Sequence, residues 1–203
     1  MLPPRARKLA LTLHVMASVG WLGAVAVFLA LALVGVTHSD AVTVRAAYVA
    51  MERATWLVIV PLAVASLLTG VVQGLGTPWG LFQHYWVVAK LLLNVAATAL
   101  LLLHTQPIGR LAAAAADPSF RPGDVRGLGW QLVGDAAGAI LALVIATVLS
   151  VYKPWGPIGL RHPGRAGSAS RIPASAKAVG VVLAGLLLLI LLMHLTGGHR
   201  ARH

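Results

Sequence analysis

Residues 9–36 form one continuous apolar run that contains a histidine at position 14. A helix needs about 20 apolar residues to cross the hydrocarbon core of a bilayer, and this run exceeds that length. The rest of the chain has too little polar surface to cover it, because 59% of the residues are hydrophobic and 10% are charged. The chain is therefore predicted to be an integral membrane protein.

Further apolar runs of spanning length follow along the chain. The predicted spans cover residues 9–36, 56–75, 85–103, 132–151 and 178–195. A membrane β-barrel would need many strands of about ten residues with alternating apolar and polar side chains, and these runs do not alternate. We predict an all-α fold in which residues 1–203 form a single transmembrane domain. It would consist of a four-helix transmembrane bundle and a fifth, C-terminal transmembrane helix.

The segments between the spans predict shorter elements. Residues 37–55 are expected to form a short helix with Ser39 or Asp40 as its N-cap. Residues 110–129 contain several prolines and glycines and are expected to form a loop with one helical turn. Small residues spaced four apart, such as Ser66 and Gly70, predict close helix packing. We expect this packing within one chain, with a homodimer as the alternative.

Positive charge is concentrated in the tails and connecting loops. The chain has 16 Lys and Arg residues against 5 Asp and Glu residues, which gives a net charge of +11. Basic loops beside spanning helices follow the positive-inside rule, so we expect contact with the lipid bilayer and not with nucleic acid. The charge bias favours a cytoplasmic N-terminus. It is expected to be a retained signal anchor, because a signal peptide has an apolar region of only about 7–15 residues.

The sequence contains no cysteine. This composition excludes disulfides, iron–sulfur clusters and thiolate ligation of haem. Any metal or cofactor chemistry must therefore use other side chains, and imidazole is the first candidate.

Histidines lie within the predicted spans or at their ends, where ionisable side chains are costly and point to function. They are His14, His84, His104 and His194. The predicted topology places His14 and His84 toward the cytoplasmic side, and His104 and His194 toward the outer side. Helical rise separates His84 from His104 by roughly 30 Å, so these two cannot ligate one metal. Two depth-matched pairs would serve two b-type haems and one pair a single haem, whereas the alternative is that these histidines are interfacial.

The first span would place its polar groups on one helical face. His14, Ser18 and Trp21 follow the helical spacing of i, i+4 and i+7. Gly20 and Gly23 would let another backbone or a flat ligand come close to this region. We therefore regard Trp21 as a cofactor-binding candidate beside His14.

A polar stripe is predicted along the third span. Lys90, Asn94 and Thr98 lie on one face, and His104 lies within about 40° of it. Lys90 either extends to the membrane surface or faces the bundle and meets an anionic group, such as a porphyrin propionate or a quinone oxygen. Asp135, at about the depth of His104, is expected either to orient that imidazole or to cap the start of its helix.

The first span, with Trp21 seven residues after His14 and then Gly23, resembles a loose group of small membrane proteins. The group includes the copper-resistance D domain and the HemJ-type protoporphyrinogen oxidase. The phrases Trp86-Val-Val-Ala-Lys90-Leu-Leu-Leu and Ser150-Val-Tyr-Lys-Pro-Trp155-Gly are most similar to an actinobacterial family of predicted integral membrane proteins of unknown function. The resemblance implies a bacterial cytoplasmic membrane, a haem association for His14 and a functional lysine at Lys90. It does not favour porphyrinogen oxidation over the other activities.

These observations leave several function classes open. The leading hypothesis is a small membrane protein that binds haem b and acts in electron transfer or as an oxidoreductase subunit, with a redox partner or quinone. A second is a haem-free transporter that uses Lys90, Asn94 and Asp135 as a polar pathway. A third is an accessory subunit of a larger membrane complex, in which the histidines have no chemical role.

Overall fold

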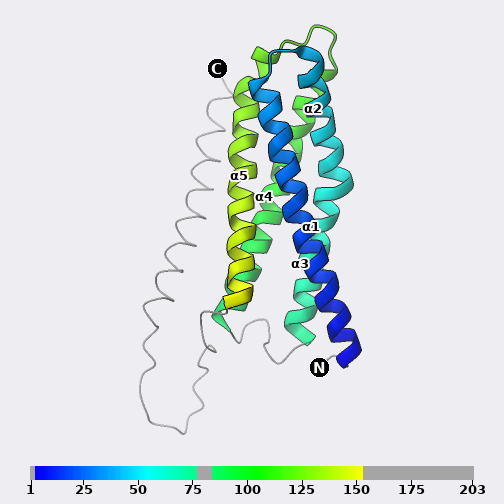
Figure 1. Cartoon of the computed structure of the whole chain (residues 1–203), viewed down its shortest axis with the longest axis vertical. Helices are drawn as coiled ribbons and strands as arrows, with labels where there is room; N and C mark the ends of the chain where they lie inside the picture. Colours follow the sequence, from blue (N-terminus) through cyan, green and yellow to red (C-terminus); the bar gives the residue numbers. More distant parts are fainter. Residues whose placement is uncertain (1–2, 77–83, 153–203) are drawn as a thin grey trace, which may run out of the picture.

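The computed structural model describes residues 3–76 and 84–152. The described elements are all helical, and Figure 1 shows their order along the chain. They are α1 (Pro4–Thr37), α2 (Ala41–Ala54), the π-helical segment η1 (Thr55–Ile59), α3 (Val60–Gly76), α4 (Tyr85–Ala116), the 3-10 segment η2 (Pro122–Val125) and α5 (Arg126–Tyr152). The predicted fifth span at residues 178–195 lies outside the described residues.

Four helical stretches of the described part are long and apolar enough to cross a membrane. They are Pro4–Thr37, Ala41–Gly76, Tyr85–Ala116 and Pro122–Tyr152. Such helices satisfy their own backbone hydrogen bonds, as a segment in hydrocarbon must. Large apolar side chains such as Leu57 and Leu103 point outward, with exposed fractions of 74% and 61%. This part of the chain is therefore an all-α bundle with the make-up of a multi-pass membrane protein.

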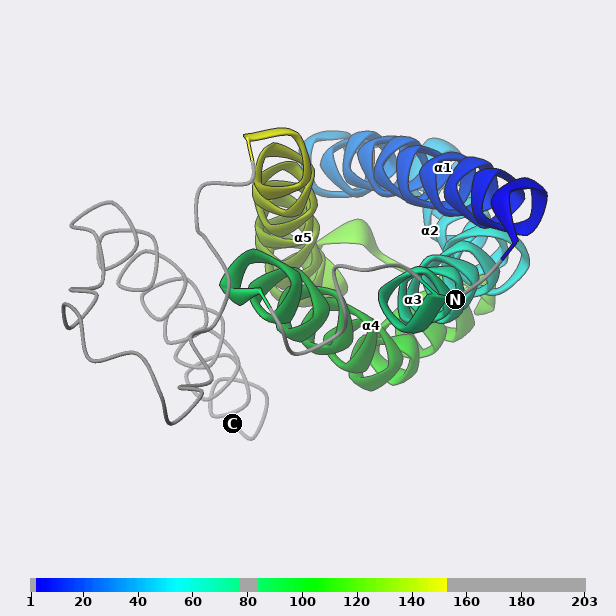
Figure 2. The same cartoon turned by 90° about the horizontal axis from the view of Figure 1, so that it is seen from below.

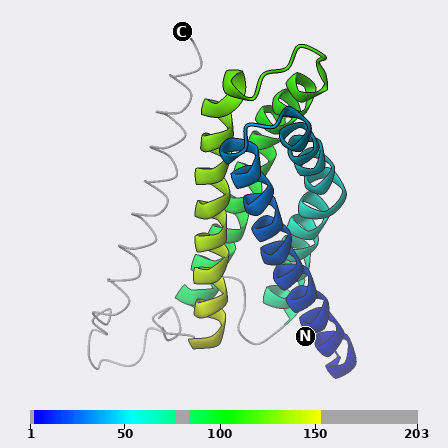
Figure 3. The same ribbon diagram turned by 45° about the horizontal axis from the view of Figure 1, so that its top comes forward.

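The helices surround a common axis, as the end-on view in Figure 2 shows. α1 packs against α5, α3 and α2, and α4 packs against the same three helices from the opposite side. α1 and α4 start at the end of the bundle where α3 and α5 finish (Figure 1). The connection between α4 and α5 lies at the other end of the bundle (Figure 3).

The apolar core fills the half of the bundle that lies away from the N-terminus. Its buried members come from α1 between Trp21 and Ala32, from α2, from η1 and the start of α3, and from the facing parts of α4 and α5. Tyr48 is 1% exposed and donates a hydrogen bond from its hydroxyl to the carbonyl oxygen of Gly35, at 3.0 Å. The half nearer the N-terminus contains a cavity instead.

The second span is longer than the sequence predicted. We expected it at residues 56–75, preceded by a separate short helix. The structure instead continues the helix without interruption from Ala41 to Gly76, through the π-helical segment η1. The difference arises because α2 is amphipathic: its apolar side chains, Val44 and Met51 among them, are buried in the core, although its overall hydropathy is low.

The expected N-cap of this short helix is confirmed at Asp40. Its carboxylate accepts hydrogen bonds from the backbone N–H of Thr43 at 2.9 Å and from the Thr43 hydroxyl at 2.6 Å. These hydrogen bonds hold the pKa of Asp40 below its usual value, because they stabilise the ionised form. A capping carboxylate also interacts favourably with the positive end of the helix dipole.

The prediction of a loop over residues 110–129 was wrong at both ends. α4 continues to Ala116, and α5 begins at Arg126. Residues 112–116 are all alanine, which has the highest helix propensity, so the third span extends well beyond the predicted limit at residue 103. The remaining turn is held to α2, since Arg45 donates a hydrogen bond to the carbonyl oxygen of Pro118 at 3.1 Å.

Candidate functional site

The half of the bundle nearer the N-terminus contains a partly open cavity of about 960 Å³ between α1, α3, α4 and α5. This volume lies at the upper end of the range of about 300–1,000 Å³ that is usual for small-molecule sites. Most lining residues are apolar. The polar residues in the lining are Arg7, His14, Ser18, Ser66, Gln73, His84, Trp86, Lys90, Asn94, Thr147 and Ser150.

His14 lines the cavity, and one of its ring nitrogens is already hydrogen-bonded to α3. Its Nδ1 lies 3.0 Å from the carbonyl oxygen of Ser66 and 3.1 Å from the hydroxyl oxygen of Thr69. A carbonyl oxygen only accepts, and the Thr69 hydroxyl donates to the carbonyl oxygen of Ala65 at 2.6 Å. Nδ1 must therefore carry the proton and donate it to both oxygens. In the neutral ring this leaves the Nε2 lone pair for a ligand.

Because Gly70 has no side chain, the His14 ring can lie directly against α3. A Cβ atom built on residue 70 would lie 3.2 Å from Cε1 of His14, which is closer than ordinary van der Waals contact. Any side chain here would therefore push the ring away from α3. The small-residue spacing of Ser66 and Gly70 thus allows α1 and α3 to approach, and it also positions the imidazole.

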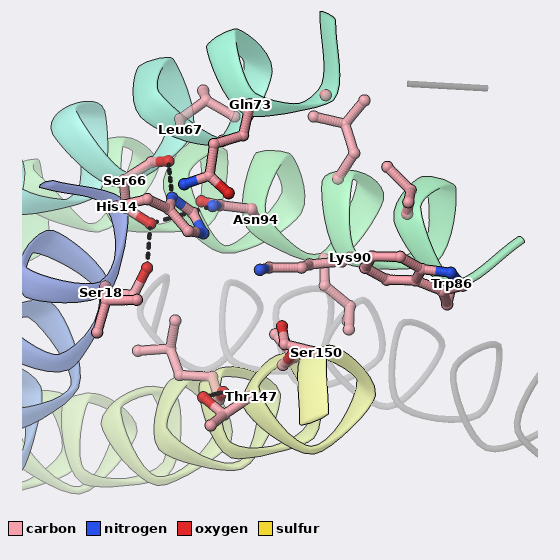
Figure 4. Close-up of a pocket in the computed structure, with 18 of the residues that line it drawn as sticks. His14, Ser18, Ser66, Leu67, Gln73, Trp86, Lys90, Asn94, Thr147 and Ser150 are labelled. Atoms are coloured by element: carbon pink, nitrogen blue, oxygen red, sulfur yellow. Dashed lines mark hydrogen bonds between the residues drawn. The ribbon is translucent and has the colours of Figure 1, made fainter. Parts of the chain in front are cut away.

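Ser66 on α3 connects this helix to α1 and α4 through hydrogen bonds of its hydroxyl group. Its hydroxyl oxygen lies 2.9 Å from the Ser18 hydroxyl and accepts a hydrogen bond from Nδ2 of Asn94 at 3.3 Å. Figure 4 shows His14, Ser18, Ser66 and Asn94 gathered at one end of the cavity. The amide oxygen of Asn94 is buried and has no hydrogen-bond partner among the described residues. It can therefore accept a hydrogen bond from a ligand or from water.

Lys90 extends from α4 into the same space. Figure 4 shows its ammonium group pointing toward His14 and Asn94 and away from Trp86 at the start of the helix. The charge is close enough to act on the His14 ring. Within residues 3–76 and 84–152, Lys90 forms neither an ion pair nor a hydrogen bond. An unpaired ammonium group within a spanning helix is costly, so Lys90 is a candidate binding group.

His84 lines the same cavity as His14. It is the N-cap residue of α4, and its ring centroid lies 6.3 Å from that of Trp86. The structure thus places one predicted histidine pair, His14 and His84, around a single cavity at the end of the bundle that contains the N-terminus. The partner predicted for His104, His194, lies outside the described residues.

His104 occupies a separate place deeper in the bundle. Its Nδ1 lies 2.7 Å from the carbonyl oxygen of Leu100, and its Nε2 lies 2.8 Å from Oδ2 of Asp135. The orienting role predicted for Asp135 is therefore confirmed. The capping role is wrong, because Asp135 lies well inside α5. Both ring nitrogens of His104 already have protein partners in this structure.

Trp21 is buried, as its face of the helix predicted, with an exposed fraction of 2%. It lines a small pocket of about 60 Å³ together with His104 and Asp135, and it is not among the residues that line the large cavity. The structure therefore groups Trp21 with His104 rather than with His14.

Among the described residues, no group of three or more His, Cys, Asp or Glu side chains could hold a metal ion.

No sequence pattern assigns a binding role to Ser66 or Arg7. The carbonyl oxygen of Ser66 fixes the His14 ring, but every residue has a carbonyl oxygen, so no sequence pattern identifies it. Arg7 lies in the basic N-terminal segment, where the positive-inside rule alone accounts for it, but it belongs to α1 and lines the cavity.

No protein-family model matches this chain, and searches of curated proteins and of solved structures also found no match.

Proposed function

We propose that this protein binds haem b in the large cavity, with His14 as an iron ligand, and that it acts in electron transfer within a membrane. The observation that carries the proposal is the fixed His14 ring. A histidine that ligates a metal usually donates its other ring N–H to a carbonyl or carboxylate oxygen, and His14 donates to Ser66. Its Nε2 is then the nitrogen available to iron.

The other lining residues suit the same group. His84 is the candidate second ligand because it borders the same cavity, and the walls are largely apolar, as a porphyrin ring requires. When bound, haem would supply an iron centre that gains and loses one electron. The chain itself would hold the imidazole in one tautomer, surround the ring with apolar side chains and balance charge through Lys90. We also propose that the chain belongs to the actinobacterial family of predicted integral membrane proteins that its sequence resembles.

A visible spectrum of the detergent-purified protein, oxidised and then reduced with dithionite, tests the proposal. We expect a Soret band and sharp α and β bands after reduction, with a pyridine extract giving the number of haems per chain. One haem per chain supports the His14–His84 cavity alone, and two would require a second site. A colourless protein from haem-replete cells would refute haem binding.

Variants separate the ligands from the remaining histidines. We expect His14→Ala to abolish the haem spectrum and His84→Ala to convert it from a six-coordinate to a five-coordinate form. His38→Ala is the matched control, because His38 is exposed at the end of α1 and away from the cavity. A His14→Ala protein that keeps the wild-type spectrum would show that another residue binds the iron.

A second candidate function is transport of a small anion, and the unpaired Lys90 ammonium favours it. The predicted pathway of Lys90, Asn94 and Asp135 would then begin in the large cavity, whereas Asp135 lines the small pocket beside His104. Flux in vesicles that is lost in Lys90→Ala, in a protein that never binds haem, would support this function over electron transfer.

We also propose that the N-terminus lies in the cytoplasm of a bacterial cell, with the multi-pass bundle in the cytoplasmic membrane. The absence of cysteine makes labelling straightforward. A single cysteine at exposed His38 should react with an impermeant thiol reagent added outside intact cells, whereas one at Arg5 should react only after lysis. The reverse pattern would place the N-terminus outside.

A further inference from the structure

We infer that the ligand of the large cavity is a largely apolar molecule with a carboxylate group, and that Lys90 binds this carboxylate. The inference deepens the proposed function and rests on it for the location of the site, but it does not depend on iron.

The charge of the cavity lining has one sign. Arg7 and Lys90 both border the cavity, and no Asp or Glu residue is among its described lining residues. The basic groups are therefore not neutralised by a carboxylate of the described chain. In a low-dielectric cavity, the attraction between these positive charges and an anion is stronger than it would be in water.

The direction of the Lys90 side chain supports a binding role over a membrane-surface role. A lysine near a helix end normally extends its ammonium group toward the membrane surface. Lys90 lies in the second turn of α4, yet its ammonium points toward His14 and Asn94, deeper in the bundle (Figure 4). This orientation leaves a costly unpaired charge unless a ligand supplies the counter-charge.

The apolar lining of the cavity indicates the chemistry of the rest of the ligand. Apolar side chains on all four helices, such as Val15, Leu67, Leu93 and Leu143, border the cavity. Such walls favour a large apolar body. The Lys90 ammonium group can pair with one carboxylate, and Arg7 is a second basic group at the same cavity. Haem, with two carboxylates on a flat apolar ring, belongs to this class.

Binding titrations with matched probes test the inference. The probes are metal-free protoporphyrin and its dimethyl ester, and a pyrene-labelled fatty acid and its methyl ester. We expect wild-type protein to bind at least one of the acids more tightly than its ester. We expect Lys90→Met to weaken binding of that acid by about tenfold, as for a lost charge-assisted hydrogen bond. Binding of the ester should be unchanged by Lys90→Met, because the ester offers no charge to the ammonium.

Lys8→Met is the matched control, since Lys8 lies on α1 and is exposed outside the cavity lining. Circular dichroism and gel filtration in detergent should show that each variant is folded. Equal affinity of the wild type for acid and ester in both probe pairs would overturn the inference, and so would an equal loss for acid and ester in Lys90→Met. Failure of both acids to bind wild-type protein would overturn it as well.

The two proposals can fail separately. Acid-selective binding of metal-free protoporphyrin through Lys90, without a histidine-ligated haem spectrum, would support the carboxylate inference and refute the haem proposal. A histidine-ligated haem that binds equally well as its dimethyl ester would do the reverse.

Discussion

Nε2 of His104 on α4 lies 2.8 Å from Oδ2 of Asp135 on α5, while Nδ1 of the same ring donates to the carbonyl oxygen of Leu100. Because Nδ1 must hold a proton, the contact between Nε2 and the carboxyl group contains one further proton. The pair is therefore either an imidazolium with a carboxylate or a neutral histidine with a neutral carboxylic acid. Both arrangements have zero net charge, which suits a site buried within the bundle.

Loss of both members of this pair should be less damaging than the two separate losses added together. We expect Asp135→Ala to lower the free energy of unfolding in detergent by about 3–5 kcal/mol, because it leaves a buried partner unsatisfied. The double variant His104→Leu/Asp135→Ala should lose less than the sum of the two single variants. Asp124→Ala, at an exposed position of η2, is the control. Strictly additive losses would show that the two side chains do not interact.

Gly70→Ala should disturb the His14 ring without unfolding the bundle. The new methyl group would meet Cε1 of His14 at 3.2 Å and push the ring away from the Ser66 carbonyl oxygen. ¹⁵N NMR of labelled histidine should then show that His14 no longer has a fixed Nδ1–H tautomer, and haem binding should weaken by about tenfold. Gly138→Ala, with no neighbouring atom within 4 Å of the new Cβ, should behave as wild type. An unchanged His14 signal in Gly70→Ala would contradict the proposed positioning.

Gly129→Ala should destabilise the core half of the bundle. A Cβ atom on residue 129 would lie 2.5 Å from Cγ1 of Val36 and 2.8 Å from the hydroxyl oxygen of Tyr48. Overpacking of this kind costs about 1–3 kcal/mol, which thermal unfolding can measure. Gly127→Ala, on the same helix but with open space around its Cβ, is the matched control and should cause no loss. Equal stability of the two variants would show that α1, α2 and α5 are not packed this closely.

Acid should loosen the start of α2. The two hydrogen bonds from Thr43 hold the pKa of Asp40 below its ordinary value of 3.8. A lowered pKa in the folded state means that the cap stabilises the helix fully above that ordinary value and is lost as the pH falls through the folded pKa. Amide exchange at Thr43, corrected for the intrinsic rate, should therefore accelerate below about pH 4. In Asp40→Asn, which caps without ionising, this acceleration should be absent. Acceleration of equal size in both proteins would assign it to another group.

The length and apolarity of the helical runs determined the class of fold. Runs of this length cannot be covered by the rest of so apolar a chain, so an all-α membrane bundle followed from the sequence. The inward face of the first helix also followed, because helical periodicity alone places His14 and Trp21 on one side, and both are buried. Helix ends were less predictable, since the packing of amphipathic α2 and of the alanine run extended two spans beyond their most apolar parts.

Only the tertiary structure decided which polar groups meet. The predicted depth in the membrane suggested that His14 and His84 belong together, and both line the same cavity. Helical spacing placed Trp21 beside His14, whereas the fold groups Trp21 with His104 and Asp135. The contact that defines the candidate site, from His14 to the Ser66 carbonyl oxygen, joins residues 52 positions apart through a backbone group. Periodicity determines the face on which a side chain lies, but the partner on the facing helix depends on the rotation and axial position of each helix in the bundle.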